Sequence, residues 1–368
     1  MDDNTVTESI TESTIKQGLA QLDIRPTCHL MVHAALSQFG HVEDGAQTVV
    51  AALRESVGPK GAVIVPSFRD SIRSVHYALR DCQDQCPQKL CPSQQRGYTG
   101  AIGETVRQQP DAIRSCHPTH SWVGIGGGAQ FLLEGHGRST TPCGSESPFL
   151  RLLERDGVLL LIGVGVNALT NIHVVEDVRN VPYLSSIDPP HRHATYTTSG
   201  RRIQYRFPDL LHNALVESEA IQSAQIGQAT CHRIGVRDLG SFLWLVTEDD
   251  PWCLVVRPTV NAYDPEADAR QKTQSMVTAW RRNPDRKAWE QLLAASKQPV
   301  RPVLFQLAVK PSTDCPAYRG VVRGYHRCAA NDLPPWERFE DYPTDEPGVA
   351  TCEHCNWPNA DSARATNG

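Results

Sequence analysis

The segment Leu160–Glu176, LLIGVGVNALTNIHVVE, holds the residues of this chain that are best suited to do chemistry. Its apolar start predicts a buried strand, its glycines predict a turn, and the rest predicts a helix carrying Thr170, His173 and Glu176. Residues three positions apart share a helix face, so His173 and Glu176 can touch. A carboxylate beside an imidazole fixes its tautomer and raises its basicity, which makes a general base that works near neutral pH. The alternative is a helix surface with an unrelated His and Glu.

The same segment also fits a nucleotide-binding fingerprint, Gly163-x-Gly165-x-x-Ala168, placed after a predicted strand. A single match of this kind is weak. The helix is interrupted by Asn180 and Pro182, and no clear second strand with a terminal acid follows. We therefore reject NAD binding. The chain also lacks a G-x-S-x-G elbow and a Walker lysine motif, which excludes the usual hydrolase and ATPase interpretations.

The elements that must position this segment alternate between strands and helices. Cys28–Val32 and Ala62–Val65 are predicted strands, and Gly45–Val57 between them is a predicted helix with apolar residues on one side. Thr14–Leu22 is a predicted amphipathic helix before the first strand. This order of elements indicates a layered α/β core.

Two regions depart from that alternation. Residues 69–109 are polar and contain Cys82, Cys86 and Cys91, so we expect an insertion or a lid. Beyond Tyr263 the composition changes, and we expect residues 264–368 to be a C-terminal addition to a core formed by residues 1–263. Helices are predicted near its start, at Asp264–Arg281 and Asp285–Lys297, each opened by an Asp as N-cap.

Six motifs follow one another along residues 15–255. In chain order they are Val32–Ser37 (VHAALS), Val63–Phe68 (VIVPSF), Arg114–Ala129 (RSCHPTHSWVGIGGGA), Pro142–Leu150 (PCGSESPFL), the GVG-x-N-x-x-T-x-x-H-x-x-E segment, and Ile226–Arg233 (IGQATCHR). Together, in this order, they resemble the antibiotic N-acetyltransferases of the aminoglycoside 3-N-acetyltransferase type.

The resemblance implies a fold and an activity. The fold class would be α/β, a layered α/β/α sandwich of the antibiotic N-acetyltransferase type with a cysteine-containing insertion and an added C-terminal region. The activity would be acetyl transfer from acetyl-CoA to an amino group of an aminoglycoside-type antibiotic, which confers resistance. His173 would be the general base, Glu176 would orient it, and Thr170 would hold the thioester or its developing oxyanion. The 2′-amine of kasugamycin is an alternative acceptor, suggested by the divergent branch of the family.

The resemblance also implies binding residues. Ala34 and Ala35 stand where the family often has serines, which leaves Ser37 and the backbone as donors at that turn. Residues near the motifs would seat a polycationic antibiotic through their carboxylates, although most acidic residues are solvated surface charges. The coenzyme A residues would be His33, Ala34, Ala35, Leu36, Ser37, Gly45, Ser67, His117 and Ser121, and the acids that bind substrate would be Asp70, Glu104, Glu146 and Asp177.

Cysteines near the C-terminus could hold a structural zinc ion. Four thiolates can form a closed tetrahedral site, and a segment with few large apolar residues often needs a metal. The proposed zinc ligands are Cys315, Cys328, Cys352 and Cys355. Reduced thiols are the alternative interpretation of these cysteines.

Two rival functions remain open. One is a metal-binding interaction protein with an inactive acyltransferase-like core. The other is a metallohydrolase that uses His117, His120 and His173.

Composition limits the class of protein. The chain of 368 residues is 40% hydrophobic and 21% charged, as expected of a globular protein, and its net charge of −5 argues against nonspecific binding to nucleic acid. The longest apolar run is too short to cross a bilayer, and the acidic N-terminus does not resemble a signal peptide. We therefore expect a cytoplasmic protein whose partners are coenzyme A and an aminoglycoside, with a homodimer left open.

Overall fold

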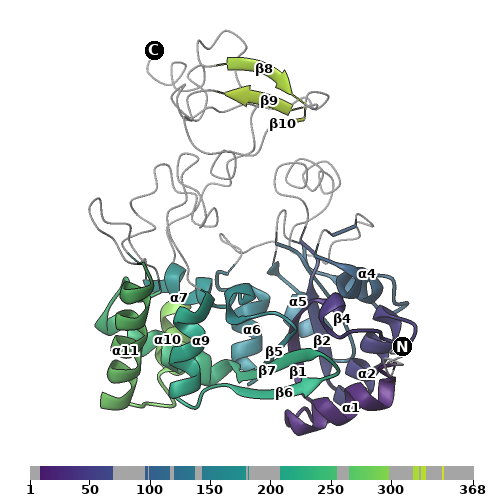
Figure 1. Ribbon diagram of the computed structural model, residues 1–368, viewed down its shortest axis with the longest axis horizontal. Coiled ribbons are helices and arrows are strands. Elements are labelled where there is room, and N and C mark those ends of the chain that lie inside the picture. The colour runs from purple at the N-terminus through teal and green to yellow at the C-terminus, as the bar shows by residue number, and fades with distance from the viewer. Residues whose placement is uncertain are drawn as a thin grey trace, which may run out of the picture.

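A seven-stranded mixed sheet forms the centre of the protein, with the strand order β3-β4-β2-β1-β5-β7-β6 (Figure 1). The computed structural model describes residues 9–68, 96–97, 99–116, 120–136, 143–179, 181, 208–254, 265–297, 318–322, 325–328 and 342–343. The strands are β1 (His29–Ala34), β2 (Ala62–Pro66), β3 (Ile113–Arg114), β4 (Trp122–Ile125), β5 (Val158–Ile162), β6 (Gln222–Ile226) and β7 (Ala229–Gly235).

The three central strands are parallel and buried. β1 lies between β2 and β5, and both neighbours run parallel to it, whereas β4 and β7 are antiparallel to the strands beside them. β5 reads VLLLI without a polar residue, which is typical of a strand that is covered on both faces. The register pairs Ala34 with Ile162, so β1 and β5 end together at one edge of the sheet.

Alternate residues of each strand point to opposite faces, and the two faces carry separate apolar clusters. Leu30 and Val32 of β1 belong to one cluster, and Met31 and Leu161 belong to the other. The first cluster includes residues of three helices, and we call this side of the sheet the α2 face. Its helices are α1 (Glu12–Gln21), α2 (Ala46–Val57) and α4 (Ala101–Arg107).

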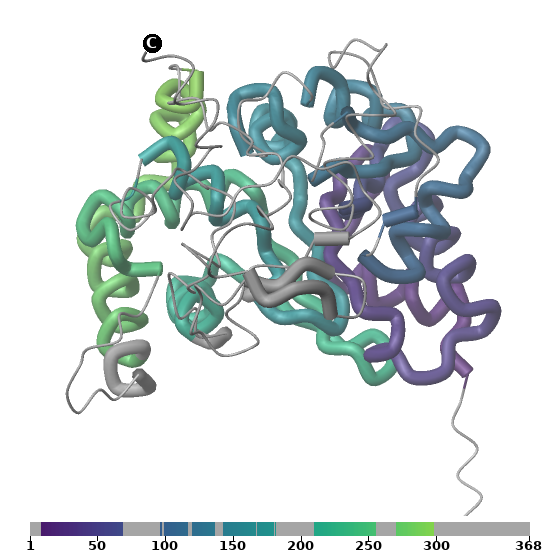
Figure 2. Tube along the Cα trace, turned by 90° about the horizontal axis from the view of Figure 1, so that it is seen from above, coloured from purple at the N-terminus to yellow at the C-terminus, as the bar shows by residue number. Residues whose placement is uncertain are grey.

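The opposite side, which we call the α7 face, is covered by a larger group of helices. In Figures 1 and 2 the green C-terminal helices lie at one end of the molecule and the purple N-terminal helices lie at the other. Two short 3-10 turns, η1 (Leu36–Gln38) and η3 (Val166–Ala168), follow β1 and β5. The helices of the α7 face are α5 (Ala129–Leu133), α6 (Pro148–Glu154), α7 (Ile172–Arg179), α9 (Pro208–Glu217), α10 (Val236–Asp249), α11 (Pro265–Arg282) and α12 (Trp289–Ser296).

Residues on the two sides of the expected boundary at 263 share one core. Met276 and Trp280 of α11 and Leu292 of α12 are buried in the same cluster as Leu159 of β5 and Val174 of α7. Helices α11 and α12 are thus part of the layer that covers the α7 face.

Other expectations can be compared with the described residues. Most of the segment 69–109 lies outside them, but its end forms α4, which is packed on α2 and the sheet through Ile102 and Val106. Asp285 does not cap α12, because the N-cap is Ala288; instead Asp285 Oδ1 accepts a hydrogen bond from the Lys287 amide (2.8 Å). The short-range bond to Lys287 competes with capping, as is usual for Asp in turns.

A second, three-stranded antiparallel sheet is described near the C-terminus, with the order β10-β9-β8. Its strands are β8 (Tyr318–Val322), β9 (Tyr325–Cys328) and β10 (Tyr342–Pro343). Within the described ranges, none of the helices combines the length and the apolar character needed to span a membrane.

Candidate active site

The carboxyl edge of β1 and β5 is a topological switch point. From β1 the chain crosses the α2 face through α2 to reach β2, and from β5 it crosses the opposite face through η3 and α7. The two connections leave in opposite directions, and this divergence is where open α/β sheets place their ligands. The segments that matter are therefore those that follow Ala34 and Ile162.

Helix α7, which follows this edge in the chain, carries a buried His–Glu pair. His173 Nδ1 and Glu176 Oε2 are 2.6 Å apart, and His173 and Glu176 are only 7% and 0% exposed. An ionised carboxylate can only accept hydrogen bonds, so an Nδ1 that donates to it carries the proton, and the basic lone pair of the neutral imidazole is then on Nε2. The contact expected from the three-residue spacing is present, and Nε2 is the atom that can accept a proton.

Two polar side chains just before α7 add further hydrogen-bonding capacity. Thr170 Oγ1 and Asn171 Oδ1 are both buried, and neither has a hydrogen-bond partner within the described part of the chain. A buried polar atom without a partner costs about 1–3 kcal/mol. Thr170 was a predicted site residue, whereas Asn171 was not, because Asn at the start of a helix usually acts as a cap.

The turn after β1 lies against the turn after β5. The Ala35 amide donates a hydrogen bond to the Ile162 carbonyl oxygen (2.9 Å), and Gly163 approaches the side chain of Gln38 so closely that a Cβ there would clash with it. Gly163 also has a φ of 62°, a conformation that favours glycine. Of the predicted coenzyme A residues in this turn, Ala34, Ala35 and Leu36 are half-buried and Ser37 is exposed.

Ser67 and Ser121, predicted from separate motifs, are adjacent in space. The Ser67 amide donates to the Ser121 carbonyl oxygen (2.9 Å), and Ser121 Oγ donates to the Ser67 carbonyl oxygen (2.8 Å). Arg114 joins them: its Nη2 donates to the Ser67 carbonyl oxygen (2.6 Å) and its Nε donates to Ser121 Oγ (3.0 Å). Arg114 is 4% exposed and was absent from the prediction, although it opens the motif that contains Ser121.

His33, at the end of β1, is a neutral buried histidine. Its ring meets Trp122 edge to face with centroids 5.4 Å apart, and its Nε2 is buried without a hydrogen-bond partner among the described residues. Burial lowers the pKa of His33 to about 4, because a charged imidazole is poorly solvated there. The alternation along β1 directs His33 to the α7 face, together with Met31.

The predicted substrate acids differ in their surroundings. Glu104 lies on α4, in the layer of the α2 face, and Arg107 and Gln108 bind its carboxylate. Arg107 holds the pKa of Glu104 below its usual range despite partial burial. Glu146 is paired with Arg151 (2.7 Å) near the start of α6. Asp177 is buried on α7, directly after Glu176.

Of the remaining predicted residues, some are described in the structure and others are not. Gly45 is the N-cap of α2, with a φ of 59°. His120 packs its ring against Phe68, with centroids 4.9 Å apart.

Several predicted residues lie outside the described residues: Asp70, His117 and three of the four predicted zinc ligands, Cys315, Cys352 and Cys355. The fourth predicted zinc ligand, Cys328, is the last residue of β9. Among the described side chains no group of three or more His, Cys, Asp or Glu could hold a metal ion, so the zinc site stays a prediction that elemental analysis can test.

A buried thiol lies near the His–Glu pair. Cys143 is 2% exposed, and burial raises its pKa well above the usual value, with the Asp177 and Glu176 carboxylates adding to the effect. Such a cysteine remains protonated and is a poor nucleophile.

Fold and site together define a layered α/β protein with a buried His–Glu pair on the helix that follows the carboxyl edge of its parallel strands in the chain. The family described as aminoglycoside 3-N-acetyltransferase matches residues 31–245. The chain belongs to this family. It is 34% identical over 179 residues to aminoglycoside N(3)-acetyltransferase III from Salmonella sp, an alignment that covers 47% of this chain and 62% of that protein. The chain thus spans less than two thirds of that relative in the alignment.

Solved structures support the layered fold. The apoenzyme of aminoglycoside acetyltransferase AAC(3)-IVa superposes with a TM-score of 0.54 at 23% identity, over 73% of this chain and 99% of that chain. AAC-IIIb in a binary complex with CoASH superposes with a TM-score of 0.50 at 22% identity, over 75% of this chain and 98% of that chain. The α/β/α architecture predicted from the motifs is confirmed.

Proposed function

We propose that the protein is an acetyl-CoA-dependent N-acetyltransferase that modifies an amino group of an aminoglycoside-type antibiotic and so confers resistance. The observation that carries the proposal is the buried contact of 2.6 Å between His173 and Glu176, on the helix that follows the switch point in the chain. The family of the chain and the names of its relatives supply the substrate class. Acetylation removes a positive charge from the antibiotic, and this charge contributes to the binding of polycations to nucleic acid.

His173 acts as the general base in this proposal. The acceptor amine is an ammonium ion near neutral pH and must lose a proton before its lone pair can react. His173 Nε2 takes that proton, directly or through one water, while Glu176 holds Nδ1–H and stabilises the imidazolium that forms. Glu176, which contacts His173, and Asp177, the next residue of α7, are both buried, and carboxylates there favour a cationic substrate.

Acetyl transfer is direct. The amine nitrogen attacks the thioester carbon, a C–N bond forms, the C–S bond breaks, and coenzyme A leaves as a thiolate that takes up a proton. The raised pKa of Cys143 argues against an acetylated cysteine as an intermediate, because the thiol beside the pair stays protonated. Thr170 Oγ1 has an unused hydrogen-bonding capacity and can donate to the oxyanion that develops on the thioester.

The residues after β1 fit the pantetheine end of an acyl-CoA. This turn is next to the glycine turn that leads into α7, so a thioester held along Ala34–Ser37 would lie beside the segment that ends in Thr170. Because the Ala35 amide already binds the Ile162 carbonyl oxygen, Ser37 supplies the hydrogen-bond donor at this turn in place of the serines that the family often has at positions 34 and 35. The known complex of the similar protein AAC-IIIb with CoASH supports coenzyme A as the donor.

A thiol-release assay tests the proposal. Purified protein is mixed with acetyl-CoA and one antibiotic at a time, from a panel that contains gentamicin-type and apramycin-type aminoglycosides and kasugamycin. We expect release of free coenzyme A that depends on the antibiotic, and a product whose mass has increased by one acetyl group. Kasugamycin turnover alone would assign the 2′-amine branch. No turnover with any antibiotic, together with no binding of coenzyme A by calorimetry, would overturn the proposal in favour of an interaction protein.

A further inference from the structure

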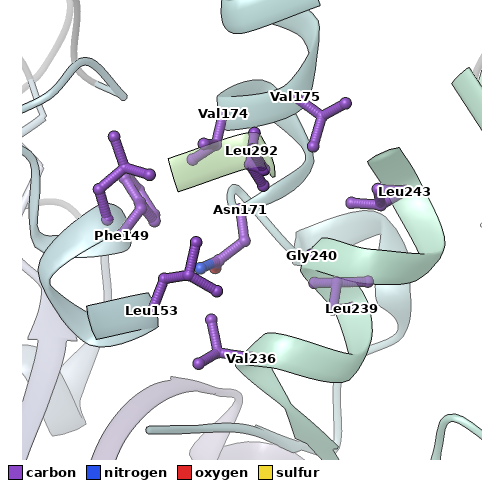
Figure 3. Close-up of a pocket in the computed structure, with 11 residues that line it drawn as sticks. Phe149, Leu153, Asn171, Val174, Val175, Val236, Leu239, Gly240, Leu243 and Leu292 are labelled. Atoms are coloured by element: carbon purple, nitrogen blue, oxygen red, sulfur yellow. The ribbon is translucent and has the colours of Figure 1, made fainter. Parts of the chain in front are cut away.

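Helix α7 has only eight residues, so its position depends on the elements behind it. On the side away from His173 and Glu176, it borders a small pocket with a cavity volume of about 20 Å³, enough for roughly one water molecule. Asn171, Val174 and Val175 line this pocket from the α7 side (Figure 3), and most of the other lining residues are apolar. Asn171 Oδ1 has no hydrogen-bond partner among the described residues, so the first turn of α7 is held on this side mainly by apolar packing.

Helix α12 also lines the pocket. Its Leu292 is one of the lining residues, is 2% exposed, and is drawn near Val174 in Figure 3. Two hydrogen bonds hold helix α12 to α10: the Trp289 amide donates to Ser241 Oγ (3.1 Å), and Trp244 Nε1 donates to Gln291 Oε1 (3.0 Å). The position of Leu292 is therefore fixed by α10.

The last turn of α7 is held by the same residue of α10. Arg179 Nη2 donates to the Trp244 carbonyl oxygen (2.8 Å), and the Arg179 guanidinium lies 3.4 Å from the centroid of the Trp244 ring. Trp244 thus contacts α7 and α12 at once. Trp244 fixes the C-terminal end of α7. The position of the N-terminal end of α7 relative to the pocket therefore depends on the side chains that fill the pocket next to Leu292.

We propose that α12 positions the His173–Glu176 pair, and that Leu292 is the positioning residue. Leu292 sets how far the first turn of α7 can retreat into the pocket, and Gln291 keeps Leu292 in place through Trp244. The inference rests on the proposed function, because the pair must be the catalytic base. It assigns a role to a helix that lies beyond residues 31–245, the range matched by the family.

Loss of the Leu292 side chain would enlarge the pocket next to α7. A displacement of about 1 Å in a catalytic group can cost about 100-fold in rate. We expect Leu292→Ala to lower kcat by about 10- to 100-fold at a temperature where the variant is folded, and to leave the affinity for coenzyme A unchanged. Leu292→Val, which removes less volume, should give a smaller loss in the same direction and serves if the alanine variant fails to fold.

Leu53→Ala is the matched control. Leu53 of α2 is equally buried but belongs to the cluster of the α2 face. A Leu→Ala change in a core costs about 2–5 kcal/mol wherever it lies, so both variants should lose stability in urea. Only Leu292→Ala should lower kcat. An equal effect of the two variants on kcat would mean that Leu292 acts through stability alone, and would overturn the proposal.

A second substitution can refill the space. A Cβ added at Gly240, within α10, would lie 3.5 Å from the position of Leu292 Cδ2 and 3.3 Å from both Leu153 Cδ1 and Trp289 Cβ, so these neighbours must shift by a few tenths of an ångström. We expect Leu292→Ala/Gly240→Ala to recover part of the kcat that Leu292→Ala loses. No recovery, with stability restored, would contradict a positioning role.

The hydrogen-bonded proton between His173 and Glu176 gives a readout that does not need turnover. Its downfield ¹H NMR signal should move in Leu292→Ala and stay in place in Leu53→Ala. If the wild-type protein acetylated no antibiotic but the signal still moved selectively, the proposed function would fail and the positioning would stand. An unmoved signal in Leu292→Ala would overturn the positioning even in an active enzyme.

Discussion

Helices α2 and α7 cover opposite faces of the same sheet, and they bury different kinds of residue. The buried residues of α2 are Val49, Val50, Ala52, Leu53 and Val57, all apolar. Helix α7 is shorter, yet it buries three ionisable side chains: His173, Glu176 and Asp177. Burial of ionisable groups opposes folding unless they are paired. Helix α2 thus contributes to the fold through apolar packing alone, whereas helix α7 gives up part of that stabilisation to hold ionisable groups within an apolar layer.

The largest effect should come from the base itself. His173→Gln removes the proton acceptor but keeps a side chain that can hydrogen-bond to Glu176. We expect the rate of acetyl transfer to fall by about 10²- to 10⁴-fold, with little change in the dissociation constant of coenzyme A. Steady-state kinetics and calorimetry measure the two quantities. Wild-type turnover at neutral pH in this variant would place the chemistry elsewhere than on α7.

The next effect should come from Thr170. Because Thr170 Oγ1 has no partner among the described residues, Thr170→Val should leave the free energy of unfolding unchanged or raise it. Loss of a donor to the oxyanion should lower kcat by about 100-fold or more. A variant that is less stable but fully active would show that the hydroxyl serves the fold. Urea unfolding and kcat, measured on the same preparation, separate the two roles.

The smallest effect should appear in stability alone, at His33. Its pKa is about 4 in the folded protein and near 6.5 when unfolded, so the unfolded chain binds a proton first as the pH falls. Stability contributed by the neutral folded histidine is therefore present above pH 6.5 and is lost as the pH falls toward 4. This histidine alone should destabilise the wild type by about 2 kcal/mol between pH 7 and pH 5. His33→Leu should remove that part of the loss, and equal pH dependence of both proteins would contradict a buried neutral His33.

Elements whose residue pattern lies within one segment of the chain could be predicted from the sequence. The apolar run of β5 and the three-residue spacing of His173 and Glu176 predicted a buried strand and a contact on one helix face, and both are present. The ordered motifs predicted the layered fold, which the solved structures confirm.

Contacts between distant segments were not predicted. Arg114 joins Ser67 and Ser121 through hydrogen bonds that span as many as 47 positions, and no spacing rule connects such residues. The burial of His33 depends on Trp122 from another strand, and the contribution of Leu292 to the pocket behind α7 depends on how α12 packs. These features follow from tertiary packing, which a pattern in one segment does not encode.

The most direct test of the account is the pH dependence of kcat/KM in wild type and in Glu176→Gln. If His173 is a base held by Glu176, activity in the wild type falls on the acid side as Nε2 becomes protonated. The uncharged amide of Glu176→Gln no longer stabilises the imidazolium, so the acid limb should move to lower pH and the maximal rate should fall by about 10- to 100-fold. An acid limb at the same pH and an unchanged maximal rate would contradict the claim that the buried pair on α7 performs the chemistry.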